Sequence, residues 1–169
     1  MAAKKKNKPP IDPPPCLHCG EPSRKVSGRV IYPNRQDLYR LIFWKCDPCG
    51  AYVGSHKRSG KPKGFPGNHE VRNARKYVHK VLDPLWRNAH RDPAYANSEK
   101  DDRAIKVIQG SARGRVYAWL AHQMGISKET CHVGMFGIEE CRMAWPLCRK
   151  ANYSEIRDWY KANKDILKK

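Results

Sequence analysis

Two pairs of cysteines have the spacing of a metal site. Cys16 and Cys19 form the first pair and Cys46 and Cys49 the second, with two residues between the thiols of each pair. Two thiolates at this spacing can bind one ion from a tight turn, and two such turns complete a tetrahedron of sulfur, which favours Zn²⁺ over harder cations. Because four protein ligands leave no open position for water, we expect one structural zinc ion rather than a catalytic one.

Glycines and histidines flank these cysteine pairs. Gly20 and Gly50 each follow a second cysteine, where the absence of a Cβ atom lets the backbone turn under the metal. His18 lies inside the first pair, but we interpret it as a non-ligand because the sulfur set is already complete. We interpret His56 as a surface group or a hydrogen-bond donor near the site.

A second group of metal-type residues has no standard spacing. It contains Cys131, His132, Cys141 and Cys148. Cys141 and Cys148 fall on one apolar helical face, which is typical of buried core cysteines, and His132 is expected to fix a local turn. Whether this group binds a second metal stays open from the sequence alone.

Catalytic motifs are missing from the sequence. It contains no Walker loop, no dinucleotide-binding fingerprint and no His-Glu-x-x-His pair. We therefore expect a protein that is not an enzyme. A Mg²⁺-dependent nuclease is a less favoured alternative, because the candidate carboxylates form adjacent groups rather than one converging site: Glu99, Asp101, Asp102, Glu139 and Glu140.

The composition predicts a polyanionic partner. The 169 residues include 34 Lys and Arg against 16 Asp and Glu, a formal net charge of +18. Such an excess repels itself unless a polyanion shares the surface, and nucleic acid is the commonest such partner. An acidic protein partner would use the same charge. No apolar run is long enough for a membrane span, and seven cysteines, four of them at metal spacing, favour a reducing cytoplasm over a disulfide scaffold.

One stretch concentrates this charge. Eight cations lie within twenty-four positions, opposed by Glu70 alone, and the glycines between them allow the backbone to approach a phosphate closely. We predict that they contact nucleic acid, DNA or RNA, mostly without reading the sequence; a solvated charged loop is the alternative. The residues are Lys57, Arg58, Lys61, Lys63, Arg72, Arg75, Lys76 and Lys80.

Aromatic residues interleave with cations around the cysteines. Such residues can stack on bases, or they can form the core of a small domain. We favour the core for Phe43 and Trp44 and leave both roles open for Tyr32, Tyr39 and Tyr52.

The chain divides into four segments of different composition, which together predict an α+β protein. A zinc ribbon is expected to pack on a helical C-terminal part. We expect a disordered basic and proline-rich arm (1–15), the zinc ribbon (16–56), a basic Gly/Pro loop (57–67) and the helical domain (68–169). The sequence does not indicate an oligomeric state.

Short β-prone runs predict the ribbon's strands. Residues 25–32 form two such runs around Ser27-Gly28, which favours a hairpin turn there. Residues 37–43 predict a turn of helix or a strand, and residues 51–53 a further strand.

Apolar periodicity predicts the helices. The stretches are 68–88, a short helix near 104–108, 113–124 with Gly125 at its C′ position, a segment containing Ile138 to Cys148, and a last helix capped by Ser154. Pro84 and Pro146 lie inside two of them and should distort those helices.

Beyond these local patterns, the combination of motifs resembles a family of small zinc-finger-containing proteins of unknown function found in phages and prophages. The resemblance covers roughly 16–148 and implies a zinc ribbon and a bacterial host cell, without implying a reaction. A phage protein that binds and modulates a host protein, such as a nucleic-acid enzyme, is therefore the alternative function. Residues 88–112 are longer than the corresponding family segment, and Gly137 stands where an aspartate is expected. The matching motifs are Cys16-x-x-Cys19-Gly20, Ile31-Tyr32-Pro33, Trp44-x-Cys46-x-x-Cys49-Gly50-Ala51-Tyr52-Val53-Gly54, His56, Asp83-Pro84-Leu85-Trp86, Ala118-Trp119-Leu120-Ala121, Met124-Gly125-Ile126, Cys131-His132-Val133-Gly134-Met135-Phe136 and Cys141.

Overall fold

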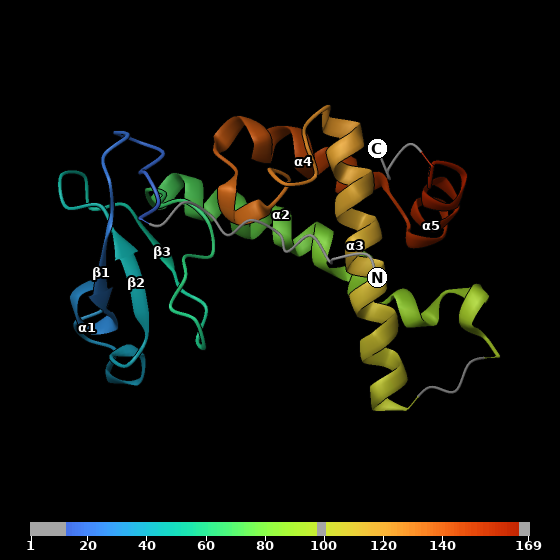
Figure 1. Cartoon of the computed structure of the whole chain (residues 1–169), viewed down its shortest axis with the longest axis horizontal. Coiled ribbons are helices and arrows are strands. Elements are labelled where there is room, and N and C mark those ends of the chain that lie inside the picture. Colours follow the sequence, from blue (N-terminus) through green and yellow to red (C-terminus); the bar gives the residue numbers. More distant parts are fainter. Residues whose placement is uncertain (1–12, 98–100, 166–169) are drawn as a thin grey trace, which may run out of the picture. The chain divides into compact units, whose positions relative to one another are not determined.

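The computed structural model describes residues 13–97 and 101–165, which fall into two compact units (Figure 1). The first unit comprises Met1–Asn73 and His132–Ile138, and the second Ala74–Cys131 and Glu139–Lys169. The predicted α+β class is confirmed, with a three-stranded antiparallel sheet and five α-helices among the described residues. Most of the predicted disordered arm, residues 1–12, lies outside the described residues.

A small sheet organises the first unit. Strands β1 (Arg24–Ser27), β2 (Ile42–Lys45) and β3 (Tyr52–Gly54) lie side by side in that order. Lys25 faces Trp44, and Trp44 faces Val53. Val26, Trp44 and Val53 are buried. Because Val26 pairs with Phe43, it lies on the other face of the sheet from Trp44 and Val53, so both faces carry buried apolar side chains.

The predicted hairpin at Ser27-Gly28 is wrong. β1 is followed by a four-residue helix, α1 (Gly28–Ile31), then by a 3₁₀ turn, η1 (Gln36–Leu38), before β2 pairs back with β1. Gly28 does not form a tight turn. It is needed because the Leu38 backbone passes close by: a Cβ atom at position 28 would lie 1.8 Å from the carbonyl oxygen of Leu38. The Gly28 N–H also donates to the carbonyl of Leu41, at 2.7 Å.

A distant segment completes the first unit. The turn η4 (Val133–Met135) buries Val133 and Phe136. The Phe65 N–H donates to the carbonyl of Gly134 at 2.9 Å. A Cβ atom on Gly64 would lie 1.9 Å from that same carbonyl oxygen, so two glycines permit two backbones to touch.

Helices build the second unit. α2 (His69–Arg87) begins in the first unit and continues into the second, and two 3₁₀ turns follow it, η2 (Ala89–Arg91) and η3 (Pro93–Tyr95). Three helices complete the unit: α3 (Asp102–Met124), α4 (Ile138–Lys150) and α5 (Tyr153–Ala162).

Helix α3 is longer than the sequence predicted. The helices expected near 104–108 and at 113–124 are one continuous helix that runs through two glycines. Its N-cap is Asp101, whose carboxylate accepts from the Ala104 N–H at 2.6 Å. Its end is as predicted: Gly125 is left-handed with φ 64°, and the Ile126 N–H donates to the Ala121 carbonyl at 3.0 Å.

One further helix prediction, the cap of the last helix, needs correction. The last helix is capped by Asn152, whose side chain accepts from the Glu155 N–H at 3.0 Å; Ser154 instead donates to Asp92. Pro84 and Pro146 lie inside α2 and α4 without ending either helix. Each proline still leaves one carbonyl of the preceding turn without its helical donor.

The second unit has an apolar core and a buried polar cluster. Leu82 on α2, Leu120 on α3 and Ile156 on α5 are almost completely buried. In the polar cluster, the buried carboxylate of Asp92 accepts from the Ser154 hydroxyl at 2.6 Å and from the Ala94 N–H at 2.8 Å, and it pairs with Arg157.

A second polar cluster joins the same elements. The Arg115 guanidinium donates to the hydroxyls of Tyr95 and Tyr153, at 2.8 and 2.7 Å. These contacts tie the 3₁₀ turn η3 to α3 and α5. None of the described helices has the length and apolar character that crossing a membrane requires.

Candidate metal centre and basic surface

The two cysteine pairs occupy turns with the same backbone geometry. In each, the N–H of the glycine after the second cysteine donates to the carbonyl of the first cysteine at 2.9 Å, from Gly20 to Cys16 and from Gly50 to Cys46. Both glycines are left-handed, with φ of 76° and 73°, a conformation that a side chain would strain. The glycines therefore close the turns, as their position in the sequence indicated.

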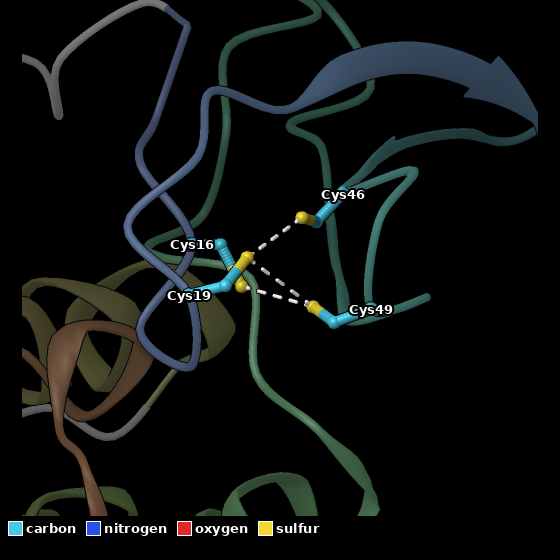
Figure 2. Close-up of side chains that lie close together, drawn as sticks. All are labelled: Cys16, Cys19, Cys46 and Cys49. Carbon is cyan, nitrogen blue, oxygen red and sulfur yellow. Dashed lines mark hydrogen bonds between the residues drawn. The ribbon is translucent and has the colours of Figure 1, made fainter.

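The four sulfur atoms converge (Figure 2). Cys16 and Cys49 are 3.4 Å apart at Sγ, Cys19 and Cys46 are 3.3 Å apart, and all four Sγ atoms lie within 4.8 Å of one another. A zinc ion bonded to four thiolates at about 2.3 Å requires sulfur–sulfur separations of roughly 3.8 Å. The donor set and its size fit one tetrahedral zinc ion, which confirms the predicted cofactor.

The two turns contribute one inner and one outer thiol each. Cys16 and Cys46 are buried, whereas Cys19 and Cys49 are exposed. Burial opposes ionisation of Cys16, but N–H groups of Cys19 and His18 and the neighbouring thiols outweigh it and lower its pKa. Burial raises the pKa of Cys46 to about 12. Zinc must therefore displace a tightly held proton from at least one ligand.

The remaining cysteines do not form a second centre. Within residues 13–97 and 101–165, the four ligand cysteines are the sole group of three or more metal-type side chains that converge. Burial raises the pKa of Cys131 and Cys148 to about 12 and that of Cys141 to about 11, so these thiols stay protonated at neutral pH. The His132 ring accepts from the Gly134 N–H at 3.1 Å, which fixes the local turn as expected.

The aromatic residues of the first unit pack against one another. Trp44 is buried and its indole N–H donates to the Gly60 carbonyl at 3.1 Å. The rings of Tyr32, Phe43 and Tyr52 meet edge-on with centroids 5.6 to 5.9 Å apart. The Arg72 guanidinium lies 3.8 Å from the Tyr52 ring centre. Since these faces are already covered, the aromatic residues build a core rather than a stacking platform for bases.

Buried residues and main-chain hydrogen bonds anchor the basic segment that follows β3. Pro62, Gly64 and Pro66 are buried, while Lys61 and Lys63 between them are exposed. Main-chain bonds anchor it: the Lys63 N–H donates to Gly54 at 2.9 Å. The predicted loop is thus an irregular but well-bonded segment with exposed cations. The alternation of Lys with Pro or Gly over 61–64 is the sequence signal for this arrangement.

The eight predicted nucleic-acid residues fall into different environments. Lys57, Arg58, Lys61 and Lys63 are exposed, and so are Lys76 and Lys80 on α2.

Two of the eight are not available as surface cations. Arg75 is buried, with 7% of its surface exposed. Arg72 is half-buried over Tyr52 and donates to the Gly67 carbonyl at 2.8 Å. Arg75 is therefore a correction to the predicted set, since a buried guanidinium cannot reach a phosphate backbone.

Most other cations of the first unit are already engaged. Residues 13–73 contain eleven Lys and Arg against four Asp and Glu. Arg24 and Lys45 pair with Asp47, and Arg35 pairs with Asp37. Lys25 lies over Trp44 and Arg29 over Tyr39. Among the described residues, the cations of this stretch outside any ion pair or ring contact are Arg40, Lys57, Arg58, Lys61 and Lys63.

The candidate nuclease carboxylates do not gather. Asp101 caps α3, and Glu139 pairs with Arg142 at 2.6 Å on α4. Glu99 lies outside the described residues. The described carboxylates contribute to no converging group of three metal-type side chains.

Comparison with known proteins identifies the family. No curated protein and no solved structure gives a significant match. The family described as a zinc-finger-containing domain matches residues 12–100 and 102–151, which include both cysteine pairs and most of the helices. The chain, with its four converging thiols, therefore belongs to this family of zinc-finger-containing domains.

Proposed function

We propose that this protein binds nucleic acid through the phosphate backbone, without catalysing a reaction. The observation that carries the proposal is the set of four exposed cations on the anchored segment 57–63, none of which has a carboxylate within ion-pair distance among the described residues: Lys57, Arg58, Lys61 and Lys63. Because hydrogen bonds already fix the backbone that carries these cations, little backbone freedom is lost when they meet a polyanion. Lys76 and Lys80 on α2 extend the set.

The packing of Tyr32, Phe43 and Tyr52 on one another supports backbone contact over base recognition. Phosphate contacts position a protein on nucleic acid and carry no sequence information directly. Binding is therefore expected to be strong at low salt and largely independent of sequence. The motif resemblance to phage and prophage proteins supports a role inside a bacterial host cell, where nucleic acid is abundant.

Salt titration of oligonucleotide affinity tests the proposal. Fluorescence anisotropy of the zinc-bound protein with a labelled duplex and a labelled single strand should show log Kd rising linearly with log salt. Replacing Lys57, Arg58, Lys61 and Lys63 by Ala should reduce that slope by about three to four and weaken binding more than tenfold at ~0.1 M salt.

A charge-matched variant provides the control. Arg40, Arg103, Lys106 and Lys128 are also exposed and lie outside residues 57–80. Replacing these four by Ala removes the same formal charge, and it should leave most of the affinity. Equal losses in the two variants would show that only net charge matters. Tight capture of a host protein with no oligonucleotide binding would instead establish the protein-modulating alternative.

A further inference from the structure

The first unit contains a third turn with the backbone geometry of the two cysteine turns. Each of the three is closed by an antiparallel bridge between residues seven apart: Pro15 with Pro22, Lys45 with Tyr52, and Ser55 with Pro62. The third turn, residues 56–61, lies in the basic segment. Its sequence, His-Lys-Arg-Ser-Gly-Lys, has no thiols and does not read as a metal site.

The hydrogen bonds of the third turn repeat those of the first. The His56 N–H donates to the Lys61 carbonyl and the Gly60 N–H donates to the His56 carbonyl, both at 2.9 Å. Cys16 makes the same two bonds, with Glu21 and Gly20, at the same distances. Gly60 is left-handed with φ 64°, as the glycines of the cysteine turns are.

In the cysteine turns, main-chain N–H groups point at a sulfur atom. The His18 N–H donates to Cys16 Sγ at 3.4 Å, and the N–H groups of Cys19 and Cys49 act likewise on Cys16 and Cys46. The equivalent donors of the third turn are the N–H groups of Arg58 and Ser59. Neither donates to any described protein group.

In the third turn, the main-chain N–H groups that donate to a cysteine sulfur in the other turns have no sulfur to bind. The two positions between its ends are both basic, Lys57 and Arg58, whereas the cysteine turns have Leu17 and His18, or Asp47 and Pro48. Successive N–H groups in a turn, surrounded by cations, form an anion-binding concavity.

We propose that the turn 56–61 is a phosphate-binding site. One phosphate group accepts from the main-chain N–H groups of Arg58 and Ser59, whose equivalents in the first cysteine turn donate to a sulfur atom. Lys57, Arg58 and Lys61 neutralise its charge. This inference rests on the proposed function only for the source of the phosphate, a nucleic-acid backbone rather than a free ion.

The turn is held rigidly enough to select an anion. The buried Trp44 donates to the Gly60 carbonyl at 3.1 Å, and the Lys61 N–H donates to the Ser59 hydroxyl oxygen at 3.4 Å. The donors are therefore arranged before the ligand arrives, which lowers the entropic cost of binding.

A proline substitution separates the main-chain donor from the side-chain charge. Arg58→Ala removes the cation and keeps the N–H group, whereas Arg58→Pro removes both. The second cysteine turn has Pro48 at the equivalent position, so this backbone accommodates proline. With a ten-nucleotide single-stranded DNA, we expect Arg58→Ala to weaken binding about threefold and Arg58→Pro by a further five- to tenfold. Zinc content and amide spectra of both variants check that the turn stays folded.

Amide chemical shifts of the wild-type protein give a test that needs no variant. Titration with the oligonucleotide should shift the Arg58 and Ser59 amide resonances more than those of His18 and Cys19. Inorganic phosphate should shift the same two amides only at much higher concentration. If phosphate shifts them and the oligonucleotide does not, the site stands and the nucleic-acid function fails.

The opposite outcome would contradict the phosphate site in the turn 56–61 but not the proposed function. If the oligonucleotide binds with the expected salt dependence, but the Arg58 and Ser59 amides do not move and the two Arg58 variants bind equally, then the turn offers only side-chain charge. The proposed function would survive that result.

Discussion

The two units reach a folded state by different means. The second unit buries large aliphatic side chains from several helices, including Leu82, Leu120 and Ile156. The first buries few of them, and one of its buried clusters consists of Cys16, Cys46 and Ala51. This cluster includes two of the four cysteines whose sulfur atoms converge. The difference teaches that metal coordination provides the folding stability of the first unit, whereas burial of apolar side chains provides that of the second.

Glycine serves the two units differently as well. In the first unit, Gly28 and Gly64 lie where another backbone passes too closely for any side chain. In the second unit, Gly110 and Gly114 occupy α3 with open space around them. Backbone proximity is thus part of how the metal-bound unit is built, whereas the helical unit holds glycines that its packing does not require.

Removing zinc should give the largest effect and act on one unit. Binding of structural zinc contributes on the order of 10 kcal/mol or more to small zinc domains, and the thin core of the first unit cannot replace it. After chelation, hydrogen exchange should accelerate throughout residues 13–73 and 132–138. Slow exchange should persist in α3 and α5. Unchanged protection of the first unit would contradict the comparison, and restored protection on adding zinc back is the control.

Truncating the helical core should act on the other unit. Leu120 is fully buried on α3, so Leu120→Ala should cost about 2–5 kcal/mol through lost burial and the cavity left behind. Denaturant unfolding followed by helical circular dichroism measures the change. Zinc stoichiometry should stay at one per chain. Loss of zinc from this variant would show that the two units do not fold independently.

Adding a methyl group to the first unit should be nearly as costly. A Cβ atom on Gly28 would overlap the Leu38 carbonyl oxygen at 1.8 Å, so Gly28→Ala forces a backbone shift that costs about 2–3 kcal/mol. The rate of zinc transfer to a chelator should rise. A variant that releases zinc as slowly as wild type would show that this close approach is dispensable.

The same substitution in the second unit should have the opposite sign. Gly110 lies inside α3 with no atom within 4 Å of a Cβ position, so Gly110→Ala should stabilise the helix by about 0.5–1 kcal/mol. The transition midpoint in denaturant measures this small gain. Destabilisation would reveal a close neighbour at this face and would weaken the contrast between the glycines.

The metal centre could be predicted from the sequence because its information is local. Two cysteines two residues apart, followed by glycine, dictate both ligand type and turn geometry. The helix end at Gly125 and the core role of Phe43 and Trp44 were predictable for the same reason.

The errors have a common origin in non-local contacts. Ser27-Gly28 looks like a hairpin turn, but glycine is required at position 28 because the backbone of Leu38, ten residues away, passes too close for a side chain. Helix α3 was split because its glycines weaken local propensity, which tertiary packing overrides. Arg75 looked like a surface cation because its burial depends on packing around α2 that local charge does not reveal. Ser154 does not cap its helix, because its hydroxyl donates to Asp92, which is distant in the sequence.

The returning segment 132–138 has a consequence for how the protein is made. The polypeptide leaves the first unit at Asn73 and supplies Val133, Gly134 and Phe136 to it only after about sixty further residues. During synthesis, the cysteine turns emerge from the ribosome long before the segment 132–138 that completes their unit. Until then, a nascent chain can bind zinc but cannot bury the surface that Phe136 will cover. The first unit, although translated early, is therefore among the last parts of the protein to complete its folding.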